Sequence, residues 1–367
     1  MAHSKFFAGP SPNIFFEDSP VGRLKKEVFE MSKEEVDRQL REDFGYPCEL
    51  EFGKAGVYIQ TTPRHDAIEN RRKNDVVLIP VGCTENHGMH NPSGMDTFMV
   101  CYIAEGVRRY TEKKGYPVNL AFPPLLYGCH PLHGIGQPGT IVVHDETAVD
   151  MVVDVMLGLW NDGYRKQILI NNHGQVVQLE EALAKFTKEY QLPGIYRIVD
   201  WHRCTRELFA VKEWGGEFDT VFNHGDEIET GIGLLGFPDM VKMEYAVDAE
   251  AIPLLPTYHF DGSIDIWRRP SRWEDGEGYT VHELFGTPCG VVGTPTKADP
   301  EKLKRPMLGI MKYLVMLIDE YLEAYPPGTV PEAEKMTLRS NEEVADYLKE
   351  PLSEGWKSVY GLGKKCF

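Results

Sequence analysis

The sequence predicts an α/β protein of three layers (α/β/α), in which helices cover both faces of a mostly parallel central sheet. Short apolar runs without a charged residue, of which Val76–Val81 is the clearest, suit strands that are buried on both faces. Longer stretches with a helical spacing of apolar side chains separate these runs. Strands that alternate with such helices form parallel sheets, because each helix carries the chain back across one face.

The expected elements follow one another from residue 76 onwards. Strands are expected at 76–81, 118–126, 167–170 and 195–199, and Pro123 and Pro124 interrupt the second of these. Helices are expected at 97–110, 147–160, 177–190, 227–235 and 302–321. A further charged, amphipathic helical pattern covers residues 22–44, before the first strand.

Changes in sequence texture divide the 367 residues into four segments. We expect the two ends to form oligomer contacts and to contribute to the rim of a pocket, since neither carries the alternating pattern of the centre. The segments are an N-terminal extension at 1–74, a core at 75–253, a continuation of the core and pocket rim at 254–325, and a C-terminal tail at 326–367.

The composition excludes several classes of partner. The chain has 56 acidic and 39 basic residues and a net charge of −17, so phosphate backbones and anionic lipid surfaces would repel it. No apolar run approaches the ~18 residues of a membrane span, and residues 1–17 lack the apolar core of a secretion signal. The seven cysteines are scattered and form no Cys-x-x-Cys pair. These features predict a cytoplasmic protein with neither nucleic acid nor membrane as a partner.

Candidate metal ligands gather where the expected strands end. Glu85 and His87 follow the first strand, and residues two apart in an extended segment point to the same side. Asp96 stands near the start of a helix, where the helix dipole favours a carboxylate. His173 follows the third expected strand, and Glu229 lies near the start of the helix expected at 227. Because ligands bind at the carboxyl ends of parallel strands, we expect these side chains to converge.

This set of residue types suits two divalent cations that share a bridging carboxylate. Such a pair acidifies water and polarises a carbonyl oxygen, which is the chemistry of a metal-dependent hydrolase. For any one of these residues, a satisfied polar group at a strand end is the commoner explanation. Several separate strand and helix ends that all offer imidazole or carboxylate favour a metal site.

The motifs around these residues resemble those of the creatininase (creatinine amidohydrolase) family. PVGCTENHG at residues 80–88, followed by an aspartate at the family's spacing, is similar to the family signature PVGSTEQHG…D. Segments at 127–140, 172–174 and 224–230 are similar to three further family motifs, in the same order. The resemblance covers about residues 76–240 and agrees with the three-layer fold.

The resemblance implies a site for two cations, zinc or manganese, and hydrolysis of small cyclic amides or related carbonyl compounds. It implies that Asp96 bridges the cations, with one completed by Glu85 and His173 and the other by His87 and Glu229. It also implies assembly into homo-oligomers, commonly hexamers.

The resemblance makes His224 the catalytic acid or base beside the substrate. We expect substrate contacts from Cys129, His133, Gln175 and His202. Gln175 occupies the position of a carboxylate ligand in creatinine-opening members of the family. Those members also have an acidic residue shortly before the catalytic histidine, whereas residues 220–223 contain none. Creatinine is therefore not the expected substrate.

The long extensions at both ends resemble a branch of the family that hydrolyses a carbon–carbon bond in a cyclic polyol diketone, 3-dehydro-scyllo-inosose, during inositol breakdown. Three other enzyme mechanisms stay open: a cyclic amide hydrolase, a single-metal hydrolase of formamides or glycosylamines, and a thiol nucleophile at Cys83 or Cys129 paired with His133. An accessory protein without catalysis is the alternative from a different class. Metal content per chain separates the two-metal, one-metal and non-catalytic alternatives.

Overall fold

Four parallel strands form the centre of the protein. The computed structural model describes residue 14 and residues 16–129, 136–249 and 289–366. Within this part of the chain the sheet has the order β2-β1-β3-β4, and every neighbouring pair is parallel. The α/β class and the parallel sheet are therefore confirmed. The strands are β1 (Val76–Val81), β2 (Asn119–Leu120), β3 (Lys166–Asn171) and β4 (Ile195–Asp200).

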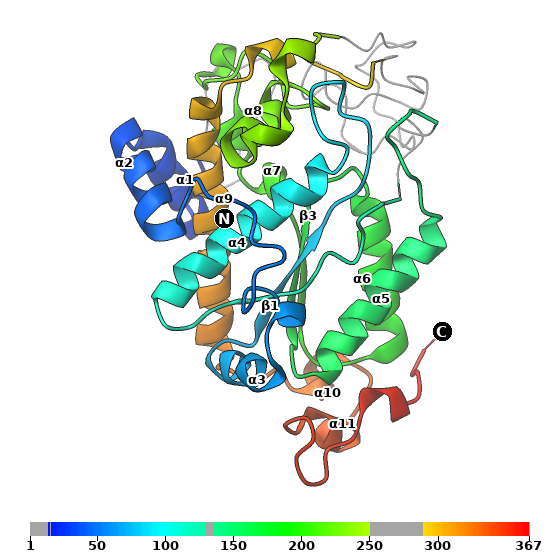
Figure 1. The fold of residues 1–367 in the computed structure, drawn as a ribbon. Helices are drawn as coiled ribbons and strands as arrows, with labels where there is room; N and C mark the ends of the chain where they lie inside the picture. The colour runs from blue at the N-terminus through cyan, green and yellow to red at the C-terminus, as the bar shows by residue number, and fades with distance from the viewer. Residues whose placement is uncertain (1–13, 15, 130–135, 250–288, 367) are drawn as a thin grey trace.

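Long helices cover the two faces of this sheet and complete the three layers (Figure 1). One face carries α4 (Met95–Lys113) and α9 (Pro300–Ala324), and the opposite face carries α5 (Asp145–Asn161) and α6 (Val176–Tyr190). These four helices each contain the range that the sequence predicts for them, with ends that differ by a few residues.

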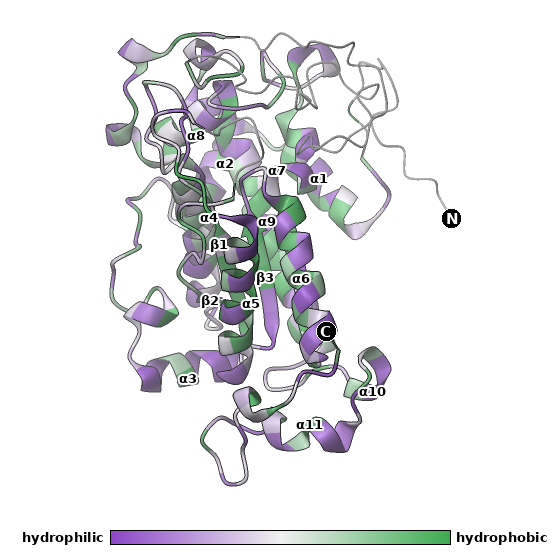
Figure 2. Ribbon diagram, turned by 90° about the vertical axis from the view of Figure 1, so that its right-hand side faces the viewer, coloured by the Kyte–Doolittle hydropathy of each residue, from purple (hydrophilic) through white to green (hydrophobic). Residues whose placement is uncertain are grey.

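Strand β1 shows why its sequence is apolar throughout. Val76 and Leu78 pack into the core on the side of α4 and α9, whereas Val77, Ile79 and Val81 pack into the core on the side of α5 and α6. All six residues of the strand are buried, because the helices leave neither face to water. Figure 2 shows the hydrophobic residues gathered in the body of the protein, whereas α3 (Arg64–Lys73) is largely hydrophilic.

Two expected elements differ from the structure. Strand β2 is much shorter than the expected 118–126, since Pro123 and Pro124 have no N–H group to continue the ladder beyond the bond from Ala121 N to Leu78 O. The pattern at 22–44 forms two α-helices, α1 (Pro20–Glu30) and α2 (Lys33–Gln39), and a short π-helical turn. The break falls at Ser32, whose side chain caps α2 by accepting a hydrogen bond from Glu35 N.

Four further helices lie at the two ends of the strands (Figure 1). Beyond the carboxyl ends lie α7 (Trp201–Cys204) and α8 (Glu227–Gly236), and beyond the amino ends lie α10 (Ala333–Met336) and α11 (Asn341–Leu348). The N-terminal helices pack on α9 of the same chain, where Arg305 donates to the carbonyl of Val28. The division into four segments and its oligomer contacts stay predictions. Among the described residues, no helix combines the length and apolarity that a membrane crossing requires.

Candidate metal centre

The candidate site lies at the carboxyl ends of the two central strands. Strands β1 and β3 are hydrogen-bonded neighbours, with Val81 opposite Asn171 at their ends. The segments that leave these strands therefore start side by side and carry Glu85 and His173 into one space. Helices α4 and α8 begin at the same place and contribute Asp96 and Glu229 from their first turns, where the helix dipole stabilises negative charge.

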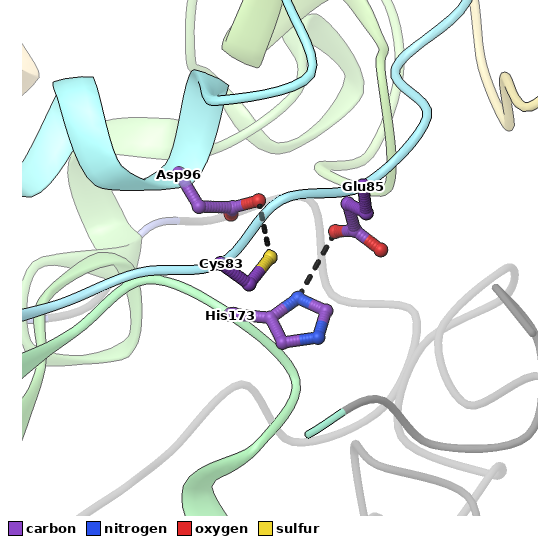
Figure 3. A group of neighbouring side chains, drawn as sticks. All are labelled: Cys83, Glu85, Asp96 and His173. Carbon is purple, nitrogen blue, oxygen red and sulfur yellow. Dashed lines mark hydrogen bonds and ion pairs between the residues drawn. The ribbon is translucent and has the colours of Figure 1, made fainter. Parts of the chain in front are cut away.

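One group of potential ligands combines Cys83, Glu85, Asp96 and His173, whose ligand atoms all lie within 4.8 Å of one another. His173 Nδ1 lies 3.0 Å from Glu85 Oε1, and Cys83 Sγ donates to Asp96 Oδ2 at 3.0 Å (Figure 3). All four residues are buried. This arrangement places a thiol, an imidazole and two carboxylates around one point.

A second group combines His87, Asp96 and Glu229 within the same limit. His87 Nε2 lies 3.4 Å from Asp96 Oδ2 and 3.4 Å from Glu229 Oε2. Asp96 belongs to both groups, so its carboxylate has the position that a bridging ligand requires. The structure thus brings together all five side chains expected as ligands; their ligand roles stay predictions.

The orientation of His87 shows that this group is suited to a cation. Its Nδ1 lies 3.1 Å from the carbonyl oxygen of Glu85, which can only accept, so Nδ1 carries a proton. Burial, followed by the charge of His224, lowers the pKa of His87 to about 3, so the ring is neutral and Nε2 presents a lone pair. In the described part of the chain Nε2 has no hydrogen-bond partner and faces carboxylate oxygens. A metal ion between these atoms would receive the lone pairs of both the imidazole nitrogen and the carboxylate oxygens.

The carboxylates of Asp96 and Glu229 are buried close to one another, which raises their pKa values. Burial, and then the charge of Glu85, raises the pKa of Asp96 well above its usual range. Burial, and then the charge of Asp96, likewise raises the pKa of Glu229. Among the residues that the structure describes, no lysine or arginine forms an ion pair with either of them. The donor set therefore fits divalent cations, whose charge would compensate these carboxylates.

Asp96 is held in place by a hydrogen-bonded chain from two strand ends. Asn172, directly before His173, donates its side-chain amide to Asp96 Oδ1 at 2.5 Å. The indole N–H of Trp201, which follows β4, donates in turn to Asn172 Oδ1. Both oxygens of Asp96 thus receive a neutral donor, one from Asn172 and one from Cys83.

Glu229 is positioned by the start of α8. Asp226 caps this helix and accepts hydrogen bonds from the backbone N–H groups of Ile228 and Glu229, at 2.9 and 3.0 Å. The N–H of Gly225 donates to Glu229 Oε2 at 2.6 Å, which turns the carboxylate back toward His87. The helix terminus therefore fixes both the backbone and the side chain of this residue.

His224 forms a third group of potential ligands with Glu85 and His87, and is less deeply buried than either of them. Its Nε2 lies 2.7 Å from the carbonyl oxygen of Asn86, to which it donates, so Nδ1 is the ring atom directed at the cluster. Nδ1 lies 3.6 Å from Glu85 Oε1, and the ring centroid lies 4.4 Å from that of His87. The catalytic role expected for His224 is untested, but its ring borders the candidate ligands.

The four residues expected to contact substrate have different surroundings. Gln175 is buried; its Oε1 accepts from Cys129 N at 3.1 Å and its Nε2 donates to Gly82 O at 2.9 Å, so it braces the backbone around Cys83. Cys129 is buried beside it. His202 packs against Phe222, with Nδ1 3.1 Å from Asp200 Oδ1, and belongs to none of the ligand groups. His133 lies outside the described residues. Substrate contact stays a prediction for all four.

Sequence reasoning missed three residues of this site. The sequence suggests Cys83 only as a nucleophile, yet it precedes Glu85 by two residues, and the spacing that selects Glu85 and His87 also selects Cys83. Asn172 could have been found as the polar neighbour of His173 at a strand end. Trp201 had no local signal, because its partner lies on a neighbouring strand.

Fold and site together define the class of protein, which is a metal-dependent hydrolase. The sequence profile of the creatininase family, described as creatinine amidohydrolase, matches residues 61–318. This match covers more than half of the chain, and the chain belongs to the creatininase family.

The chain is similar to the 3-dehydro-scyllo-inosose hydrolase of Thermotoga maritima, with 41% identity over 308 residues that make up 84% of this chain and 97% of that protein. Among solved structures it resembles a creatininase with Mn, with a TM-score of 0.53 and 20% identity over 75% of this chain and 100% of that one. It also resembles a variant creatininase of the Zn-Zn type, with a TM-score of 0.54 and 19% identity over 75% of this chain and 100% of that one. At these identities the solved structures show the fold alone.

Proposed function

We propose that this chain is a dinuclear metal hydrolase that opens a small cyclic polyol diketone, 3-dehydro-scyllo-inosose, by hydrolysis of a carbon–carbon bond. The observation that carries the proposal is the buried Nε2 of His87, which faces the carboxylates of Asp96 and Glu229 and suits a cation. The choice of substrate is supported by the similarity to the hydrolase of that name over most of both chains. A place in inositol catabolism follows from the same similarity.

Within this proposal, each group of side chains holds one cation and Asp96 bridges them. Glu85 and His173 complete the first site, and His87 and Glu229 complete the second. When bound, a pair of divalent ions such as zinc or manganese acidifies water and polarises a carbonyl oxygen. The chain keeps the bridging carboxylate in one orientation through the hydrogen bonds on its two oxygens.

His224 moves the proton that carbon–carbon cleavage requires. The bond from Nε2 to Asn86 O fixes the ring, so a proton is held or released at Nδ1, on the side of the ligands. As the oxygen of water bonds to the ring carbonyl carbon, Nδ1 takes one proton from that water; the bond from this carbon to its ring neighbour then breaks, and the neighbour, which keeps the bonding electrons, takes the proton back from Nδ1. The second proton of water leaves the new carboxyl group. The products are a carboxylate at one end of the opened chain and a protonated carbon at the other.

An uncharged polyol suits the surroundings of His224 better than creatinine does. Residues 220–223 have no acidic side chain to pair with a guanidine-like ring. Gln175, in place of a ligand carboxylate, is bonded to the backbone on both ends of its amide. A cyclic amide hydrolase is the second candidate, favoured by the creatininases of the same fold, and a single-metal formamide or glycosylamine hydrolase is the third. Assembly as a homo-oligomer, in particular a hexamer, belongs to the proposal.

Metal depletion and reconstitution tests the proposal directly. The full chain is stripped with a chelator, titrated with Zn²⁺ or Mn²⁺, and assayed with 3-dehydro-scyllo-inosose, creatinine and a formamide, while bound metal per chain is measured. We expect the diketone to be turned over only after two equivalents are bound, and creatinine to be left intact. Full activity with one equivalent would favour the single-metal alternative. Activity that survives complete metal removal would refute the proposal.

A further inference from the structure

The thiol of Cys83 lies inside the first ligand group. Its Sγ lies within 4.8 Å of the ligand atoms of Glu85, Asp96 and His173, and Figure 3 shows all four side chains directed toward one another. We propose that Cys83 is the fourth ligand of the first cation site and makes this site selective for zinc over manganese. The inference rests on the proposed two-cation function and adds a residue and a metal preference to it.

Backbone packing holds Cys83 in this position. A Cβ on Gly82 would lie 2.4 Å from Thr97 Cα, so only glycine lets the end of β1 approach the start of α4 this closely. Behind Cys83, Gly128 has a φ of +73°, and a Cβ there would lie 2.3 Å from the Cβ of Cys83. Gln175 ties the Gly82 carbonyl to the same loop. The thiol is therefore directed at Asp96 by contacts on both sides.

A second, independent observation supports a cation at the carboxylate that Cys83 contacts. Asp96 Oδ2 receives the thiol and also lies 3.4 Å from Nε2 of His87. That nitrogen is fully buried, has no hydrogen-bond partner in the described ranges, and presents a lone pair. Asp96 Oδ2 thus lies between the sulfur of one ligand group and the unpartnered nitrogen of the other, which is where a carboxylate shared by two cations would lie.

The two ligand groups offer different donor atoms. The first offers one sulfur, one nitrogen and two carboxylates, which is a complete tetrahedral set for zinc. The second, of His87, Asp96 and Glu229, offers nitrogen and oxygen only. Ligation requires Sγ to release its proton to the buffer, after which the thiolate favours softer ions, whereas oxygen-rich sites suit manganese. The chain therefore separates its two cations by ligand softness.

Cobalt binding provides a readout that does not depend on catalysis. Metal-free full-length protein is titrated with Co²⁺, and the sulfur-to-cobalt charge-transfer absorption is recorded in the near ultraviolet. We expect the wild type and Cys129→Ser to show this absorption, and Cys83→Ser to lack it. Cys129 is the matched control because it is also a buried thiol next to Gln175 but belongs to no ligand group formed by the described residues.

Two further measurements make the test independent of how Cys83→Ser folds. X-ray absorption at the zinc edge of the wild-type protein should show a sulfur neighbour at about 2.3 Å in addition to the nearer nitrogen and oxygen atoms. In a competition dialysis against Zn²⁺ and Mn²⁺, Cys83→Ser should lower the ratio of bound zinc to manganese by about tenfold or more, because hydroxyl oxygen replaces sulfur.

The outcomes separate this inference from the proposed function. A wild type that binds two cations and turns over the diketone, but shows neither the cobalt absorption nor a zinc–sulfur distance, overturns the inference alone. Absorption that persists in Cys83→Ser, or disappears in Cys129→Ser, overturns it as well. A wild type that binds no cation refutes both.

Discussion

The two ends of the central sheet bury charge in opposite ways. At the amino ends of the strands, Lys166 Nζ donates to both oxygens of Asp75 at 2.6 and 2.7 Å, and Gly328 N adds a third bond to that carboxylate at 3.0 Å. At the carboxyl ends, Asp96 and Glu229 are equally buried but form no ion pair with a lysine or arginine of the described segments. One end is neutralised by the chain itself and the other is not.

This difference separates a structural site from a functional one. A buried ion pair with its hydrogen bonds complete needs nothing further, and its groups contribute to the fold. Buried carboxylates with raised pKa values, and a neutral imidazole directed at them, leave a deficit of positive charge that a ligand can fill. Neutralisation of a buried carboxylate should therefore have opposite effects at the two ends.

The largest effect is expected for Asp96→Asn, which removes the shared carboxylate but keeps its shape. Loss of an outer partner of a ligand already costs about 10–100-fold, so turnover of the diketone by metal-loaded enzyme should fall by more than ~100-fold. The unfolding free energy of the metal-free variant at pH 8 should rise rather than fall, because one crowded carboxylate is gone. Steady-state assays and urea unfolding measure the two quantities. Activity within tenfold of the wild type would remove Asp96 from the mechanism.

The opposite behaviour is expected for Asp75→Asn at the other end of the sheet. The substitution leaves Lys166 fully buried without its counter-charge, which should lower the free energy of unfolding by about 3–5 kcal/mol. The exposed pair of Lys185 and Asp150 provides the control, since Asp150→Asn should change the free energy of unfolding by less than ~1 kcal/mol. Turnover per folded molecule should stay unchanged in both variants. Equal stability of the two variants would show that the Asp75 pair is not the stabilising feature described here.

A smaller, pH-dependent effect is expected at Glu105, a buried carboxylate of α4 outside the ligand groups. It contacts Tyr58 Oη and Glu51 N, each at 2.8 Å, and burial raises its pKa from 4.5 to about 7. A raised pKa in the folded state contributes stability below pH 4.5, and that stability is lost as the pH rises toward 7. Glu105→Gln, which resembles the protonated side chain, should avoid this loss and become more stable than the wild type by roughly 3 kcal/mol at pH 8. Urea unfolding at a series of pH values measures this difference in the free energy of unfolding. If the wild type and Glu105→Gln showed the same pH dependence, the raised pKa of Glu105 would be contradicted.

The sequence predicted the fold where burial alone decides it. The run Val76–Val81 predicted a strand covered on both faces, and the dense apolar residues of α5 predicted a helix packed against the sheet, as the structure shows. The break at Ser32 was not foreseen, because a single capping side chain ended a helical pattern that continued in the sequence. The length of β2 was not predicted either, because the sequence does not show where the last backbone hydrogen bond to β1 falls before the two prolines.

The site was predictable to the extent that it follows from strand ends. Glu85 and His173 could be chosen because parallel neighbours deliver their ends to one place. The hydrogen bonds that orient Asp96 could not be predicted, since Trp201 follows β4 and Asn172 follows its neighbour β3, and the sequence does not encode this strand order locally. The hydrogen bond from Gln175 to the carbonyl of Gly82 could not be predicted either, because it depends on how two loops approach each other.

The bond from Gly328 to Asp75 has a consequence for biosynthesis. Strands β1 and β3 leave the ribosome long before the segment that carries Gly328, and the carbonyl of Pro326 also contacts Lys166. Until that segment emerges, Asp75 and Lys166 each lack one of their hydrogen-bond partners. Synthesis that stops before residue 326 would therefore give a chain that contains all of the candidate metal ligands but lacks two of the contacts to the buried pair of Asp75 and Lys166.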